Sequence, residues 1–185
     1  MNQAPVHKIS LLNERQIVKW VGAEMALSEG EPCDCADAAI NNCTIHPPVL
    51  WQHPSVPYLQ FTVIDMHLAD GRVFQLFSQA EDGTGHHGFF LVEIQSNEQL
   101  IPDHPEKGSI YRTQVLHELP VGIARITVVR RNGPNADIEA TISIDGNTIR
   151  IFAAEVEEIA YGRFRIVDCD ESILLQLNGI RPIPL

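Results

Sequence analysis

Residues 138–152, which read IEATISIDGNTIRIF, carry the clearest structural signal in the sequence. Apolar and polar side chains alternate along it on both sides of Asp145-Gly146-Asn147, a group of residues typical of a turn. One face of the resulting hairpin carries Ile138, Ala140, Ile142, Ile144, Ile149 and Ile151. Glu139 and Arg150 fall on the opposite face. This alternation predicts an antiparallel sheet with one buried face and one solvated face.

The same pattern extends along the chain in both directions. Residues 61–68 and 73–77 flank Asp70-Gly71, which predicts a hairpin with a two-residue type I′ turn that places Leu68 opposite Val73. Further strands are expected at residues 89–94, 124–129, 156–160, 164–167 and 173–177. About eight to ten strands at hairpin spacing predict a mainly β fold, either an antiparallel up-and-down barrel or a two-sheet sandwich.

Two segments near the start differ from this pattern. Residues 13–29 predict one amphipathic helix, with Asn13 as its N-cap and with apolar residues at helical spacing, namely Ile17, Val18, Val21 and Met25. Residues 32–57 contain five prolines, three cysteines and two histidines, and they predict a Pro/Cys/His-rich loop. With strands over residues 58–177, residues 1–185 are expected to form a single domain, because a chain of this length buries about 70% of its unfolded surface.

The chain is acidic, with 13 Lys and Arg residues against 24 Asp and Glu residues and a formal net charge of −11. The imbalance lies in residues 1–106, which hold four basic and fourteen acidic residues. Phosphate backbones repel such a chain, so nucleic-acid binding is not expected. No run approaches the roughly 18 apolar residues of a membrane span, and residues 1–16 lack the features of a signal peptide, so we expect no membrane partner and a cytoplasmic location.

A first candidate metal site consists of Cys33, Cys35, Cys43 and His46. Three thiolates and one imidazole are a sensible zinc set, although the spacing is not that of a standard zinc finger. If residues 34–42 form a short helix, Cys35 and Cys43 lie about 12 Å apart along its axis, which one metal ion cannot easily bridge. The alternative is a group of free thiols in a loop or short helix.

A second candidate metal site follows from the histidines, seven of which precede residue 107. Asp65 and His67 share one face of a predicted strand, and His86 and His87 lie close to the start of a later strand. Neutral imidazole and carboxylate are the usual ligands of a catalytic zinc or iron ion. The alternative is a surface or structural role for each histidine by itself.

No motif establishes catalysis, and the sequence leaves open whether the protein is an enzyme. Gly83-Thr-Gly85-His-His-Gly88 matches G-x-G-x-x-G, but a predicted strand follows it instead of the helix that would receive a phosphate. Cys169 lies between Asp168 and Asp170, which disfavour the thiolate form of a nucleophile. The arginines of the late strands alternate with Glu139, Glu155 and Glu157, and this predicts an ion-paired solvated face.

Three functions are compatible with this sequence. The first is a non-catalytic acidic binding protein whose first half engages a basic protein partner, because complementary charge speeds and orients association. The second is a zinc- or iron-binding β-barrel protein, with metal-dependent catalysis as one use of the ion. The third is a carrier that encloses a small apolar ligand. The sequence identifies neither the partner nor the oligomeric state.

Overall fold

The computed structural model describes residues 6–28, 49–80, 85–94, 110–132, 136–160 and 162–178. The strands are β1 (Val6–His7), β2 (Gln16–Met25), β3 (Leu59–Leu68), β4 (Val73–Ala80), β5 (His87–Ile94), β6 (Tyr111–Val115), β7 (Gly122–Ile123), β8 (Arg125–Asn132), β9 (Ala136–Ile144), β10 (Asn147–Ala160) and β11 (Arg163–Leu177). The only helix in these ranges is η1 (Ile9–Leu12), one turn of 3-10 helix.

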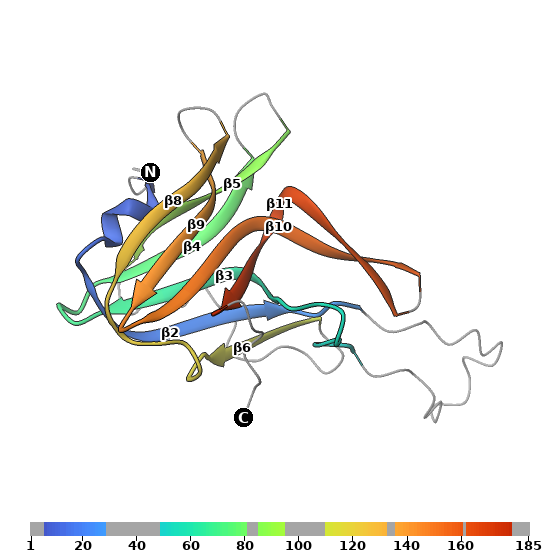
Figure 1. Cartoon of the computed structure of the whole chain (residues 1–185), viewed down its shortest axis with the longest axis horizontal. Helices are drawn as coiled ribbons and strands as arrows, with labels where there is room; N and C mark the ends of the chain where they lie inside the picture. The colour runs from blue at the N-terminus through green and yellow to red at the C-terminus, as the bar shows by residue number, and fades with distance from the viewer. Residues whose placement is uncertain are drawn as a thin grey trace.

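Six strands close into an antiparallel barrel in the order β5-β4-β3-β11-β10-β9 (Figure 1). The pair between Phe89 of β5 and Asp137 of β9 closes the ring. The remaining strands are additions: β8 pairs with β9, β1 with β5, and β2 with β3, β6 and β7. The mainly β antiparallel prediction is therefore confirmed, and of the two expected architectures the closed barrel is the one observed.

The hairpin of residues 138–152 forms as its alternation predicts. Ile142 pairs with Ile149, and Ala140 pairs with Ile151, all with fully buried side chains. On the outer face Arg150 donates a hydrogen bond to Glu139 at 2.8 Å. The turn needs positive φ at both central residues, 48° at Asp145 and 80° at Gly146, which is the geometry of a type I′ turn.

The helix predicted for residues 13–29 is wrong, because β2 occupies most of this segment. The misleading signal is the three-residue spacing of Ile17 and Trp20, both of which are buried. A register shift between Ile17 and Lys19 inserts an extra residue into β2, so two core side chains three positions apart face the same way. Asn13 is not an N-cap: it is the C-cap residue of η1, and its side-chain Oδ1 accepts a hydrogen bond from the Ile126 backbone N–H at 3.0 Å.

The register predicted for the β3–β4 hairpin is wrong by one residue. His67, instead of Leu68, pairs with Val73, and the Leu68 N–H donates to the Arg72 carbonyl at 2.9 Å. The loop therefore has three residues and ends in Gly71 with φ at 86°, which is the geometry of a turn followed by a left-handed glycine. The shift places Asp65 opposite Gln75, whose side-chain amide donates to the carboxylate at 2.8 Å.

The predicted Pro/Cys/His-rich loop is not supported as a structural unit. Residues 32–48 of it lie outside the described residues. In residues 49–57, Leu50 forms an isolated bridge with Ser28, and the rest of this part has no regular structure.

Candidate functional site

The candidate site lies where one edge of β3 changes partner. At Val63 this strand pairs with Ala23 of β2 on one edge and with Phe77 of β4 on the other. At Phe61 it still pairs with β2, but its second partner is now Ile173 of β11. Strands β4 and β11 therefore follow one another along the same edge of β3. They diverge at residue 62 and leave a wedge-shaped gap in the sheet.

A four-residue insertion in β11 fills part of this gap. Ala153 of β10 pairs with Ile173, whereas the next residue, Ala154, pairs with Asp168. Residues 169–172 of β11 consequently have no counterpart on β10, and we call them the acidic bulge. The bulge begins at Cys169, which has a left-handed φ of 57°. Its carbonyl at Asp170 accepts a hydrogen bond from Ser78 Oγ of β4 at 2.8 Å, which ties the bulge to the opposite wall.

Beyond the bulge, β10 and β11 continue as a two-stranded arm, which comprises residues 154–160 and 163–168 (Figure 1). Along β10 in the arm, alternate side chains point either into a small core cluster or into the gap. Ala154 and Val156 belong to a small second core cluster. Glu155 and Glu157 each follow one of these residues in sequence and line the gap. The period of two along a strand thus directs two carboxylates into the same space as the bulge.

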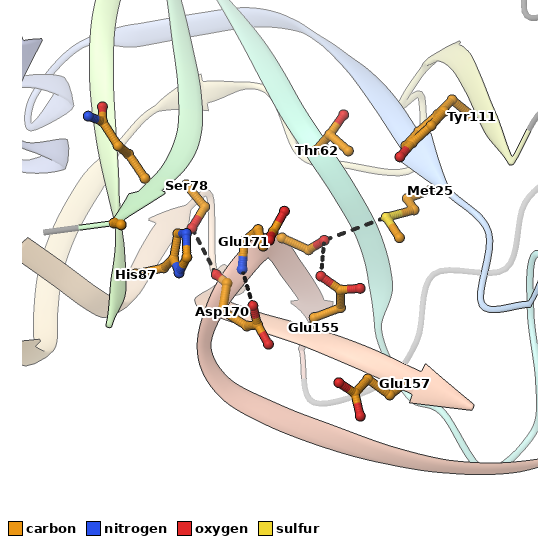
Figure 2. Close-up of a pocket in the computed structure, with 12 residues that line it drawn as sticks. Met25, Thr62, Ser78, His87, Tyr111, Glu155, Glu157, Asp170 and Glu171 are labelled. Atoms are coloured by element: carbon orange, nitrogen blue, oxygen red, sulfur yellow. Dashed lines mark hydrogen bonds between the residues drawn. The ribbon is translucent and has the colours of Figure 1, made fainter. Parts of the chain in front are cut away.

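These elements enclose a half-open cavity of about 690 Å³, which we call the acidic pocket. Its acidic side chains are Glu155, Glu157, Asp170 and Glu171. Figure 2 shows these four carboxylates between His87 of β5 and a wall that contains Met25, Thr62 and Tyr111. Among the described residues that line the pocket there is no Lys or Arg.

Only one of the four carboxylates has a cationic partner within the described part of the chain. Arg165 Nε donates to Glu157 at 2.7 Å from the same arm. The Asp170 carboxylate accepts the Glu171 backbone N–H at 2.8 Å, and Ser172 Oγ donates to Glu155 at 3.3 Å. These contacts are hydrogen bonds without a compensating positive charge.

Glu155 shows the electrostatic consequence most clearly. Burial raises the pKa of Glu155 above its usual value, and the negative charge of Asp170 raises it further. The Ser172 hydrogen bond lowers the pKa in part, whereas Glu171 and Glu157 add to the increase. The pocket therefore holds negative charge against mutual repulsion, a condition that a bound cation relieves.

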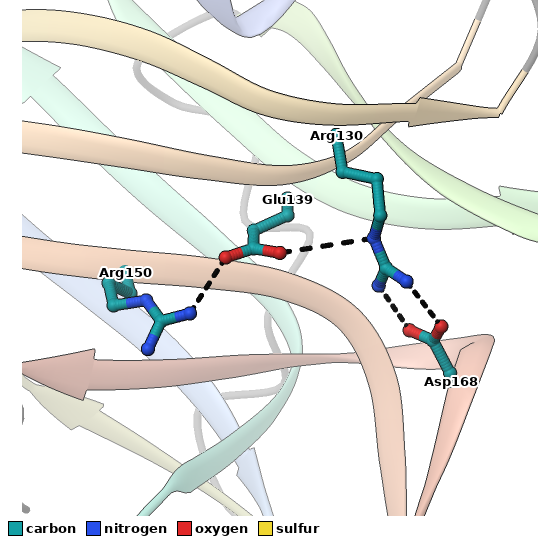
Figure 3. Close-up of polar contacts among 4 residues, drawn as sticks. All are labelled: Arg130, Glu139, Arg150 and Asp168. Carbon is teal, nitrogen blue, oxygen red and sulfur yellow. Dashed lines mark hydrogen bonds and ion pairs between the residues drawn. The ribbon is translucent and has the colours of Figure 1, made fainter.

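A network of ion pairs crosses the outer surface and ends at the start of the bulge (Figure 3). Arg150 of β10 and Arg130 of β8 both contact Glu139 of β9, at 2.8 and 3.8 Å. Arg130 also holds the Asp168 carboxylate through two hydrogen bonds of 2.7 and 2.5 Å. The predicted ion pairs are thus present for Glu139 and for Glu157, which also lines the pocket, whereas Glu155 lines the pocket and pairs with no described arginine.

The Cys33, Cys35, Cys43 and His46 set lies outside the described residues, so its zinc site stays a prediction. Elsewhere, the described residues contain no group of three or more His, Cys, Asp or Glu side chains that could hold a metal ion.

The structure does not bring the second metal set together. Asp65 is level with Gln75 and Val92 across the sheet, and His87 lies five residues from Val92 along β5, a span of about 16 Å. Asp65 and His67 lie close together on β3, and His86 directly precedes His87 at the start of β5, so the set forms two separate pairs. Burial raises the pKa of Asp65 and lowers that of His67, and the attraction between the two groups offsets each shift only in part.

The acidic character predicted for the first half of the chain is only partly visible. Nine of its fourteen carboxylates lie outside the described residues. Among the other five, Glu24 is buried against Arg112 at 2.5 Å, Asp65 accepts from Gln75, and Asp70 pairs with Arg72 at 2.6 Å. The carboxylates that gather in the described part come from the second half of the chain.

Burial raises the pKa of the Cys169 thiol, and the Asp168 charge raises it further, which agrees with the expectation of a disfavoured thiolate.

Compared with known proteins, the chain matches no family model, no curated protein and no solved structure. None of the described helices is long and apolar enough to cross a membrane.

Proposed function

We propose that this protein binds a basic protein partner and that the acidic pocket receives a lysine or arginine side chain of that partner. The observation that carries the proposal is the group of four carboxylates in one cavity, three of which have no ion pair with a described residue. A cation bound there replaces repulsion among carboxylates by attraction.

The chemistry of the pocket suits a lysine or arginine side chain. A lysine or arginine has an apolar stem below its charged head. Met25 and Tyr111 offer apolar surface at one side, and the carboxylates of Glu155 and Asp170 offer acceptors for the charged group. Arginine adds a planar fork of donors that suits carboxylates, whereas lysine acts as a compact charge.

The test is a binding titration with fluorescently labelled oligo-arginine and oligo-lysine peptides, followed by anisotropy. We expect binding that weakens as salt is added, because salt screens partly exposed charges. Glu155→Gln and Asp170→Asn each keep the side-chain shape and remove one charge. Each is expected to weaken binding at least about tenfold, since a hydrogen bond to a charged group contributes about 1.5–3 kcal/mol.

The matched control is Glu93→Gln, which removes the same charge from an exposed position on β5. His87 at the start of β5 lines the pocket, whereas Glu93 lies near the end of this strand. The proposal expects this variant to bind like the parent protein. Equal weakening by Glu93→Gln and Glu155→Gln would show that net charge, instead of the pocket, attracts the peptide. Absence of binding to either peptide at low salt would refute the proposal.

The other two functions have less support from the described residues. The histidine and carboxylate set of the metal hypothesis is spread over about 16 Å of sheet. The apolar-carrier hypothesis needs an interior cavity, yet the core is filled by fully buried side chains such as Ile64, Leu76 and Ile142. A barrel of six strands is also narrower than the eight-stranded barrels that hold one small ligand.

A further inference from the structure

Arg130 occupies an unusual place in the sheet. Register shifts lie on both sides of its pair with Glu139, so the β8 backbone is irregular at this residue. Such irregularities re-aim a side chain. The Arg130 guanidinium reaches Asp168 on β11, although β9 and β10 separate the two strands in the sheet order. Figure 3 shows it extending from its own strand toward the corner of β11.

The residue that Arg130 holds stands directly before the acidic bulge. Asp168 is the last residue of β11 that pairs with the arm of β10, and Cys169 then turns into the left-handed region. The contact is a two-donor, two-acceptor pair, which fixes the direction of the carboxylate as well as its distance. On the other side of the bulge, Ser78 binds the Asp170 carbonyl. The bulge is thus held from the outside by Arg130 and from the pocket side by β4.

We propose that Arg130, through Asp168, is a positioning residue for the acidic pocket: it holds the bulge so that Asp170 and Glu171 face the ligand cation. The binding part of this inference rests on the proposed function. Arg130 is not among the residues that line the pocket, so its effect passes through the backbone of residues 168–170.

The sign of the effect separates positioning from simple electrostatics. Arg130→Gln removes a positive charge, so electrostatics without positioning predicts tighter binding of a cationic peptide. Positioning predicts weaker binding in spite of the added negative charge. The matched control is Arg150→Gln, which removes the same charge from the same network but from a residue that binds Glu139 instead of Asp168.

The experiment measures the affinity of the oligo-arginine peptide for the full chain and for the Arg130→Gln, Arg130→Lys and Arg150→Gln variants. We expect Arg130→Gln to bind roughly fivefold more weakly, the upper range for an exposed ion pair. Arg130→Lys keeps the charge and is expected to recover part of the loss. Arg150→Gln is expected to bind as well as the parent chain or slightly better.

A second readout, hydrogen exchange of the amides of residues 169–172, does not depend on any ligand. Positioning predicts faster exchange there in Arg130→Gln and unchanged exchange in Arg150→Gln. If both variants bind the peptide equally well or better than the parent, the inference is overturned and the proposed function stands. If the parent chain binds no peptide, the proposed function fails, and unchanged exchange in Arg130→Gln then overturns the positioning role as well.

Discussion

Glu155→Gln should stabilise the protein at neutral pH while it weakens cation binding. Burial and the nearby negative charges raise the pKa of Glu155, so the folded state holds this proton more tightly than the unfolded state. The ionised carboxylate therefore destabilises the fold above the folded-state pKa. Asp170 and Glu171 supply two repulsive contacts without ion pairs, and each is worth a few tenths of a kcal/mol, so we expect a gain of about 0.5–1 kcal/mol.

Thermal and denaturant unfolding of the two proteins, at neutral pH and at about pH 3, measure this gain. A gain of this size raises the Tm by about 1–4 °C in a chain of this length. The difference should disappear at the acidic pH, where Glu155 is protonated in both states of the parent protein. Glu93→Gln serves again as the control and should change stability little. A loss of more than about 1 kcal/mol in Glu155→Gln would contradict this expectation, because it would show that the ionised carboxylate stabilises the fold.

Three further substitutions test the fold, each read from the denaturant midpoint. Gly22→Ala places a Cβ 2.6 Å from the buried Phe61 ring and should destabilise by about 1–3 kcal/mol; an unchanged midpoint would contradict this packing. Arg112→Ala removes the cation beside the buried Glu24 carboxylate and should destabilise by about 3 kcal/mol, whereas a change below about 0.5 kcal/mol would show that the pair is not needed. Ile142→Ala should lose about 2–5 kcal/mol if this side chain lies in the core as described.

Local alternation predicts where the barrel strands lie, but it divides β10 and β11 into shorter pieces. The sequence of residues 138–152 identifies both strands, the turn and the buried face, because the period of two continues without interruption on each side of Asp145-Gly146. The prediction is wrong where a strand contains an extra residue. In β2 the insertion after Ile17 creates helical spacing between core side chains, and this spacing misleads although the β-branched residues Ile17, Val18 and Val21 favour a strand.

The candidate site depends on a larger insertion of the same kind. The sequence predicts two short strands, at residues 164–167 and 173–177, but both belong to β11 and share one partner, β10. The polar run DCDES at residues 168–172 is the only sequence signal of the bulge. The approach of this run to Glu155 follows from the tertiary change of partner along β3, which local pattern does not contain.

Backbone amide chemical shifts, recorded while the oligo-arginine peptide is added, test directly whether the acidic pocket is the binding site. We expect the largest changes to cluster at residues 78–80, 87, 155–157 and 169–172, which surround the acidic pocket. We also expect Glu155→Gln to suppress these changes. Chemical-shift changes that are spread evenly over the protein, or that are largest away from these residues, would contradict binding at the acidic pocket.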